Sequence, residues 1–314
     1  MSEIHVVFGT GAIGLALLDE LAAAGLRARA VNRSGQAEGP DGVEIVAGDA
    51  SDPEFAARAA TDAAVVYQCL NPPYHRWAEL FPPLQDAAVH AARTNGARYV
   101  SFENTYMYGD THGVPMTETT ALGTQTRKGR VRLAMAEQLC SLGARGDLEV
   151  TTARASDYFG PRGTRQSPLG DLVIGAALND KPCRVMGNPE QPHSYTYIPD
   201  AARTLAVLGT RGDVAGEVFH VPNAPAQSTR EIIGVVSEQL GRRLKVSTTP
   251  RPVLRLIGLF NPVVRELDEM AYEFTQPFVV DSAKAETRLG LAPTPLSKAI
   301  ADTIAWFRTR AGSQ

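Results

Sequence analysis

The fold is decided by the stretch Ile4-His5-Val6-Val7-Phe8-Gly9-Thr10-Gly11-Ala12-Ile13-Gly14. Its first five residues predict a short buried strand, and apolar residues from Ile13 onward recur at helical spacing as far as Gly25. Between strand and helix lies Gly-x-Gly-x-x-Gly, the context in which this pattern binds a dinucleotide. The first glycine permits a tight turn, the second lets the backbone approach a pyrophosphate, and the third lets the helix pack closely. We assign to this site Gly9, Thr10, Gly11, Ala12, Ile13 and Gly14.

The same alternation of strands and helices continues through the first half of the chain. Further strands are predicted at 27–31, 43–47, 63–69, 98–102 and 149–155, and helices at 77–94 and 131–142. Strands separated by helices imply right-handed crossovers and a parallel sheet that is covered on both faces. The sequence therefore predicts an α/β fold with a Rossmann-type doubly wound parallel sheet.

The pattern changes after Gly160-Pro161, where glycine and proline become frequent. Helices are predicted at about 171–178 and 200–208, a strand at 217–221, and an amphipathic helix at 296–307. We therefore expect a dinucleotide-binding domain at 1–160 plus about 200–222. A smaller, mostly helical substrate lobe is expected at about 161–199 plus 223–314.

The composition narrows the class of partner. With 31 basic and 34 acidic residues among 314, the chain has no global charge that would recruit nucleic acid or an anionic membrane. Its 3 cysteines, at 69, 140 and 183, have neither disulfide-framework nor zinc-knuckle spacing. No apolar run reaches the length of a membrane span, and the N-terminus begins directly as a strand without a signal peptide. We expect a cytoplasmic protein with a small-molecule substrate, and leave open a homodimer.

The end of the second predicted strand favours NADP over NAD. An NAD site usually has a carboxylate there for the ribose 2′-hydroxyl, whereas this chain has Asn32, Arg33 and Ser34, which suit a 2′-phosphate. The alternative is that Arg33 is only a solvated loop residue. After the third strand, Gly48, Asp49 and Ala50 form a second candidate contact, with the adenine, although Asp49 could equally cap a turn. Further cofactor contacts are expected from Leu70, Asn71 and Ala155 at later strand ends.

Taken together, these motifs resemble the extended short-chain dehydrogenase/reductases of the NAD-dependent epimerase/dehydratase group, and more closely its atypical members. Matching segments are the glycine loop, 48–52, 106–109, 154–161, 195–200, 229–232 and 281–307. The resemblance implies the Rossmann fold, a nicotinamide cofactor and hydride chemistry. It does not specify the reaction, because fold and function are separable.

The resemblance fails at the family's acid–base pair, Tyr-x-x-x-Lys. None of the nine tyrosines has a lysine four residues later. Near the expected positions stand Lys128 and Arg132, which share one face of a helix. We name Lys128, Asn104 and Tyr106 as catalytic candidates: Lys128 as proton donor or nicotinamide-ribose contact, Asn104 as donor to a substrate carbonyl, and Tyr106 as alternative acid. The competing interpretations are a solvated basic helix start for Lys128 and packing for the tyrosine.

Candidate substrate residues come from both parts of the chain. Tyr74 belongs to the loop Asn71 to Trp77, which we expect to wall the substrate cavity. The family pattern adds Tyr108, Asp157, His193 and Tyr195, with a turn acid as the alternative for Asp157. The six histidines lack the HxxxH and HExxH spacings, so no metal site is expected.

Three functions fit these observations. The first is an NADP(H)-dependent oxidoreductase that transfers a hydride to or from a carbonyl or alcohol carbon of a small molecule. The second is a nucleotide-sugar epimerase or dehydratase that recycles its NAD(P). The third is a non-catalytic NADP-binding sensor or scaffold, which would bind the cofactor without turnover. We favour the first.

Overall fold

The computed structural model describes residues 3–249 and 268–311, together with residues 253, 256, 259, 260 and 266. The chain forms two compact units. Unit 1 comprises Met1–Met107, Leu122–Ala155 and Ala201–Val221, and unit 2 comprises Tyr108–Ala121, Ser156–Asp200 and Pro222–Gln314. The predicted division differs from these bounds in two places: it set the first boundary at 160 and left 108–121 in the first domain.

Unit 1 is a seven-stranded parallel sheet in the order β11-β6-β5-β4-β1-β2-β3. Its strands are β1 Ile4–Phe8, β2 Arg27–Asn32, β3 Glu44–Ala47, β4 Ala63–Gln68, β5 Arg98–Glu103, β6 Val150–Arg154 and β11 Val218–His220. The order reverses between β1 and β4, the switch point at which doubly wound sheets bind ligands. This confirms the predicted Rossmann-type fold.

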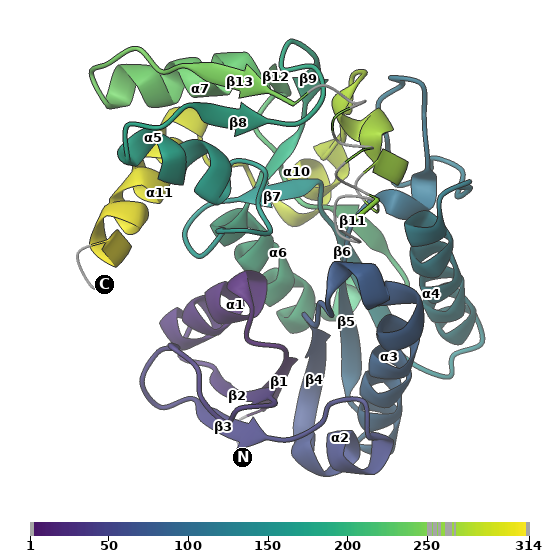
Figure 1. The fold of residues 1–314 in the computed structure, drawn as a ribbon. Coiled ribbons are helices and arrows are strands. Elements are labelled where there is room, and N and C mark those ends of the chain that lie inside the picture. Colours follow the sequence, from purple (N-terminus) through teal and green to yellow (C-terminus); the bar gives the residue numbers. More distant parts are fainter. Residues whose placement is uncertain are drawn as a thin grey trace. The chain divides into compact units, whose positions relative to one another are not determined.

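Helices cover both faces of this sheet (Figure 1). They are α1 Ala12–Ala23, α2 Pro53–Ala59, α3 Trp77–Thr94, α4 Arg127–Ala144 and α6 Ile198–Thr210, with short 3-10 turns η1 Tyr74–Arg76, η2 Tyr106–Tyr108 and η4 Gly212–Val214. The helices α2, α3 and α4 pack on one face around a core that includes Val66, Tyr99 and Leu139. In Figure 1, α1 and α6 lie on the opposite side of the sheet.

The helix α2 was not predicted, although its start carries strong local signals. Asp52 is its N-cap and accepts a hydrogen bond from the backbone N–H of Glu54 at 3.0 Å, while Pro53 occupies the first helical position. The helix is only seven residues long and alanine-rich, so its apolar pattern is too short to show a period.

Unit 2 contains short strands in pairs as well as helices. Its elements are β7 Asp157–Phe159, the π-helix η3 Gly170–Gly175, α5 Ala176–Leu178, β8 Cys183–Val185, β9 Pro192–His193, β10 Tyr195–Tyr197, β12 Gln227–Ser228, α7 Thr229–Gln239, β13 Val246–Thr248, η5 Ala271–Phe274, α10 Ala283–Leu289 and α11 Leu296–Ala311. The pairs are β10 with β7, β12 with β9, and β13 with β8. The expectation of a mostly helical lobe missed these strands, because two or three residues cannot display an alternating pattern.

The core of unit 2 joins segments that lie far apart in sequence. Phe159, Ile174 and Val236 pack with Ile300 and Phe307 in one buried cluster. The helix α7 begins with a capping box, in which Ser228 and Glu231 each bond the other's backbone N–H. Packing between distant segments and capping of α7 therefore both stabilise the fold of unit 2.

Candidate active site

The glycine loop between β1 and α1 has the geometry of a phosphate cradle. Gly9 has φ +101°, a value that favours glycine, and a Cβ there would lie 2.8 Å from the backbone oxygen of Cys69. A Cβ at Gly14 would lie 1.9 Å from the backbone oxygen of Gly9. At Gly11, by contrast, a Cβ would meet nothing within 4 Å. The loop is thus closed on its protein side and open at Gly11, where the first N–H groups of α1 lack helical partners.

The residues at the end of β2 mainly shape a turn. The Asn32 amide donates to Thr10 Oγ1 and to the backbone oxygen of Gln36, both at 2.9 Å, and its carbonyl accepts from Gly35 N–H at 2.7 Å. The Ser34 hydroxyl donates to the same Asn32 carbonyl at 3.3 Å. These hydrogen bonds hold the turn in place, and the direct cofactor contacts of Asn32 and Ser34 stay predictions. Arg33 is exposed, with no ion pair among the described residues.

Asp49 follows β3 and also forms a turn. Its carboxylate accepts from the backbone N–H of Ser51 at 2.9 Å and from the Ser51 hydroxyl at 2.7 Å. These hydrogen bonds lower the pKa of Asp49, and the nearby positive charge of Arg33 adds to the effect. A Cβ at Gly48 would collide with the Phe55 ring at 2.2 Å, so packing requires glycine there. Ala50 is buried, and its contact with adenine stays a prediction together with that of Asp49.

At the end of β4 the chain runs into the loop that surrounds Lys128. The thiol of Cys69 is buried beneath the glycine loop, and burial raises its pKa to about 12. Leu70 and Asn71 follow it at the strand end. The Trp77 indole then donates to the backbone oxygen of Pro72 at 3.1 Å and holds the loop closed.

Lys128 lies in an aromatic cage at the start of α4. Its side chain is only 4% exposed, and Nζ donates to the backbone oxygen of Tyr74 at 2.5 Å. Nζ also stands 4.7 Å from the centre of the Tyr74 ring and 5.8 Å from that of Trp77. Both distances lie within the range of cation–π contacts. The interpretation of Lys128 as a solvated helix residue is therefore wrong.

Tyr106 and Asn104 lie beside this cage. The Tyr106 ring packs against Trp77 at 5.8 Å between centres, so Lys128 and Tyr106 share one aromatic neighbour. Asn104 uses its carbonyl oxygen to accept from the Tyr106 backbone N–H at 3.3 Å, which leaves its amide group as the donor. The structure thus brings the three catalytic candidates to one edge of unit 1, at the ends of β4 and β5.

A buried charged cluster stands one helical turn beyond Lys128; of its members, only Arg132 was considered from the sequence, near the position of the family's lysine. Arg132 is 2% exposed, its guanidinium lies 4.7 Å above the Phe81 ring, and its Nε has no partner among the described residues. Burial lowers the pKa of Arg132, while the Glu103 carboxylate opposes that shift. Glu103 itself pairs with Arg154 at 3.0 Å. The sequence signal that could have revealed this cluster is a charged residue at the end of each of two buried strands, Glu103 on β5 and Arg154 on β6.

In unit 2, Asp157 and His193 form an ion pair. The distance between His193 Nε2 and Asp157 Oδ2 is 3.1 Å, and His193 Nδ1 lies 3.1 Å from the backbone oxygen of Glu273. Each ring nitrogen of His193 thus faces one oxygen atom of a neighbouring residue. The ring stacks on Phe274 with centres 5.2 Å apart. Asp157 is the more exposed partner, with 19% of its side chain open.

Glu273 is a second buried acid in this cluster, and sequence inspection gave no signal for it. It is 1% exposed, and burial raises its pKa well above the ordinary value, with the charge of Asp157 adding to the rise. The cluster therefore combines a buried carboxyl, Glu273, with the Asp157–His193 pair.

Of the remaining predicted substrate residues, Tyr195 and Tyr108 are buried and Tyr74 is partly buried, and their contacts with a substrate stay predictions. Tyr195 is 6% exposed and its hydroxyl lies 2.7 Å from Thr229 Oγ1. Tyr108 is 3% exposed and packs with Met116, Phe278 and Val280. Tyr74 packs its ring around Lys128, as described above. In unit 1, the cofactor candidates Ile13 and Ala155 are also buried, and the Ala155 N–H donates to the backbone oxygen of Glu103 at 2.9 Å.

Two absences hold for the described part of the chain. Its residues contain no group of three or more His, Cys, Asp or Glu side chains arranged to hold a metal ion. None of its helices has both the length and the apolar character needed to cross a membrane.

The fold and the open glycine loop are those of the doubly wound α/β class, many of whose members bind dinucleotides. The chain belongs to the NAD dependent epimerase/dehydratase family, whose family model matches residues 4–221. This confirms the resemblance seen in the motifs, and it places the chain in a family of enzymes.

Curated relatives match about half of their own length. A dTDP-glucose 4,6-dehydratase of Neisseria gonorrhoeae is 25% identical over 204 residues, which cover 64% of this chain and 56% of the dehydratase. An uncharacterized UDP-glucose epimerase of Bacillus subtilis is 23% identical over 157 residues, 49% of each chain. These matches bear on the family more than on the activity of the whole protein.

Solved structures share the fold over nearly the full chain. MoeE5 in complex with UDP-glucose and NAD has a TM-score of 0.79 and 20% identity, and covers 99% of this chain and 100% of its own. The Thermotoga maritima UDP-glucose 4-epimerase with UDP-glucose gives 0.80 and 16%, covering 98% and 99%. The Streptomyces venezuelae dehydratase DesIV with NAD bound gives 0.79 and 17%, covering 99% and 98%. At these identities the likeness shows the fold alone.

Proposed function

We propose that this protein is a nucleotide-sugar epimerase or dehydratase that recycles a nicotinamide dinucleotide. This was the second of the three functions that the sequence allowed, and the relatives now favour it over the NADP-consuming reductase. The observation that carries the proposal is the pairing, at one edge of unit 1, of an open glycine loop with a caged lysine at the start of α4.

The residues of the glycine loop fit a dinucleotide. The open space at Gly11 and the N–H groups that begin α1 suit a pyrophosphate, and the adjoining strand ends suit its two nucleosides. When bound, the nicotinamide accepts a hydride from a substrate carbon and returns it later. Retention of the cofactor through this cycle means that no external reductant is consumed.

Lys128 is the group to which we assign proton transfer. Oxidation of a sugar alcohol releases a hydride from carbon and a proton from the hydroxyl, so a base must take that proton. Lys128 would take up this proton in the oxidation step and return it in the reverse step. Tyr106 is the alternative acid, and the Asn104 amide would hold the substrate oxygen. Orienting the substrate against the cofactor would supply further rate enhancement.

The test measures both the product and the cofactor. Purified protein is assayed for bound NAD or NADP, then incubated with UDP-glucose, dTDP-glucose and related nucleotide sugars while the sugar is followed by NMR and the dinucleotide by absorbance. We expect a changed sugar without net oxidation of added NADH or NADPH. Product formation that consumes one NADPH for each turnover would instead identify the reductase.

Substitutions on one helix identify the base. Lys128→Met should lower kcat at least about 100-fold, the usual size of a lost acid–base contribution. The matched control is Arg130→Met on the same turn, because Arg130 is exposed and only donates to the backbone oxygen of Gln125. Tyr106→Phe tests the alternative acid. Cofactor bound without turnover on any sugar, in the wild-type protein, would favour the non-catalytic sensor.

The NADP preference is a separate proposal, and it supports the reductase as a second candidate. The end of β2 offers Arg33 and no carboxylate, a composition that suits a 2′-phosphate. Two of the solved structures cited above, MoeE5 and DesIV, hold NAD. A comparison of the Kd values of NAD and NADP decides between them. The cytoplasmic location and the homodimer expected from the sequence stay predictions.

A further inference from the structure

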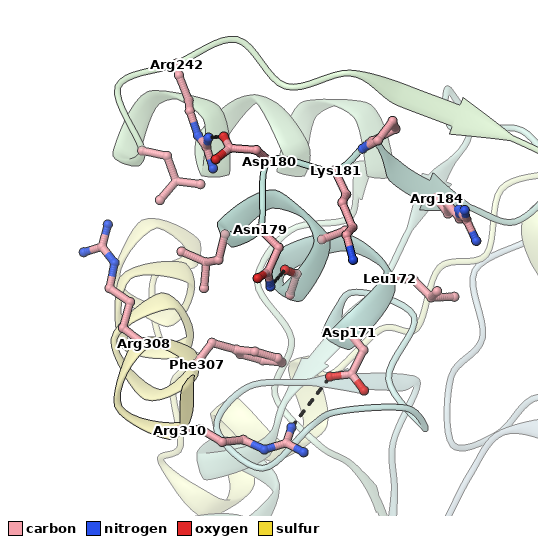
Figure 2. Close-up of a pocket in the computed structure, with 15 residues that line it drawn as sticks. Asp171, Leu172, Asn179, Asp180, Lys181, Arg184, Arg242, Phe307, Arg308 and Arg310 are labelled. Carbon is pink, nitrogen blue, oxygen red and sulfur yellow. Dashed lines mark hydrogen bonds and ion pairs between the residues drawn. The ribbon is translucent and has the colours of Figure 1, made fainter. Parts of the chain in front are cut away.

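Unit 2 contains a cavity that none of the predicted substrate residues lines. Its volume is about 870 Å³, within the range of small-molecule sites. The walls come from η3, α5, the loop that follows α5, the β8 strand, the end of α7 and the last turns of α11 (Figure 2). The lining residues are Asp171, Leu172, Gly175, Ala176, Leu178, Asn179, Asp180, Lys181, Pro182, Arg184, Leu240, Arg242, Phe307, Arg308 and Arg310.

Cations outnumber acids in this lining by five to two. Both acids are already paired: Asp180 with Arg242, and Asp171 with Arg310 at 3.7 Å. Arg242 also donates to the backbone oxygen of Ala177, which fixes its position. Figure 2 draws both ion pairs. The carboxylates are thus occupied by partners within the cavity wall.

Three cations remain after this pairing. Lys181, Arg184 and Arg308 are exposed and have no ion pair among the residues that the structure describes. The whole chain has a formal net charge of -3, so this local excess does not reflect a generally basic protein. Like charges gathered in a concave wall repel one another and raise the local potential for an anion.

Helix dipoles explain only part of this arrangement. Arg308 and Arg310 lie in the last turn of α11, where a cation interacts favourably with the helix C-terminus. Lys181 lies in the loop after α5, and Arg184 is on β8, so neither gains from that dipole. Their presence in the same lining requires another reason, and an anionic ligand provides one.

The cavity also offers apolar surface. The Phe307 ring and the side chains of Leu178 and Leu240 belong to the lining. Figure 2 shows the Phe307 ring reaching from α11 toward the side of the cavity that carries Asp171. We propose that this cavity binds a small molecule that carries several phosphate groups on an organic ring, of the size of a nucleoside triphosphate. All of the cavity's lining residues belong to unit 2.

Binding of defined polyphosphates tests the proposal. Calorimetry with inorganic tripolyphosphate, GTP and guanosine separates the phosphate chain from the ring. We expect tripolyphosphate and GTP to bind, guanosine to bind at least about tenfold more weakly than GTP, and the affinity for tripolyphosphate to fall as salt rises. The triple variant Lys181→Ala, Arg184→Ala, Arg308→Ala should raise the Kd of tripolyphosphate at least about tenfold.

Two controls locate the binding. A variant with the same loss of charge, Arg58→Ala, Arg93→Ala, Arg145→Ala, removes three exposed arginines of unit 1 and should bind tripolyphosphate as the wild type does. Gly11→Glu, which blocks the dinucleotide loop, should also leave this binding unchanged. Equal affinity of the wild type and the Lys181, Arg184, Arg308 variant would overturn the proposal, as would loss of tripolyphosphate binding in Gly11→Glu. Neither result depends on the epimerase activity.

Discussion

Two substitutions in the glycine loop separate its role in folding from its role in binding. In Gly14→Ala, the new Cβ would lie 1.9 Å from the backbone oxygen of Gly9, whereas carbon–oxygen contacts normally exceed about 3.3 Å. The oxygen belongs to backbone, so the loop or α1 must move. Overpacking of this kind costs about 1–3 kcal/mol or more, and replacing glycine by alanine in a helix regains at most about 1 kcal/mol. We expect a net loss of about 2 kcal/mol.

The matched substitution Gly11→Ala should leave the fold intact. Its Cβ would have no neighbour within 4 Å, and its φ of -75° suits alanine. A gain of about 0.4–1 kcal/mol from a less flexible unfolded chain roughly cancels a similar loss at the N-cap. Any large effect on cofactor affinity must therefore come from the ligand, because the new methyl group occupies the space assigned to the pyrophosphate.

Thermal unfolding and calorimetry read the two effects. Gly14→Ala should lower Tm by about 4–8 °C. Gly11→Ala should change Tm by less than about 2 °C and raise the Kd of NAD or NADP at least about tenfold, which corresponds to about 1.4 kcal/mol. Wild-type cofactor affinity in Gly11→Ala would refute the assignment of this loop to the pyrophosphate. An unchanged Tm in Gly14→Ala would refute the steric account of the third glycine.

Three further predictions concern buried and exposed charges. Because burial raises the folded-state pKa of Glu273 above its unfolded value, the folded state loses stability as pH rises above about 4.5, by up to about 1.4 kcal/mol per pH unit. The variant Glu273→Gln should remove this pH dependence. Parallel Tm curves of the wild type and the variant from pH 5 to 8 would contradict the prediction. Glu103→Ala should destabilise unit 1 by about 3–5 kcal/mol, because the buried guanidinium groups of Arg132 and Arg154 lose their neighbouring carboxylate. Arg132→Met should cost less than about 1 kcal/mol. Urea unfolding measures both effects. Arg33→Glu should raise the Kd of NADP at least about tenfold while that of NAD changes less than about threefold, and equal effects on both would argue against a 2′-phosphate contact.

The sequence by itself determined the doubly wound sheet and the cofactor loop. Both depend on patterns that are local in the sequence. The sheet follows from the alternation of strands and helices, and the loop follows from three glycines. Their spacing allows a tight turn, the approach of a ligand to the backbone, and close packing of the helix against the loop. These features need no knowledge of distant residues. The same local reasoning found Lys128 and Arg132 four residues apart on one helix.

Only the tertiary structure decided what surrounds those side chains. The cage of Lys128 comes from Tyr74, 54 positions away, and Arg154 meets Glu103 across 51 positions. In unit 2, short strands bring His193 to Asp157, 36 positions earlier. Such contacts produce no periodic pattern in the sequence, because burial and charge pairing depend on how distant segments pack together. The order of residues along the chain shows only which residues are neighbours in sequence. The sequence therefore determined where the cofactor loop lies, and the tertiary structure decided which buried groups stand beside it.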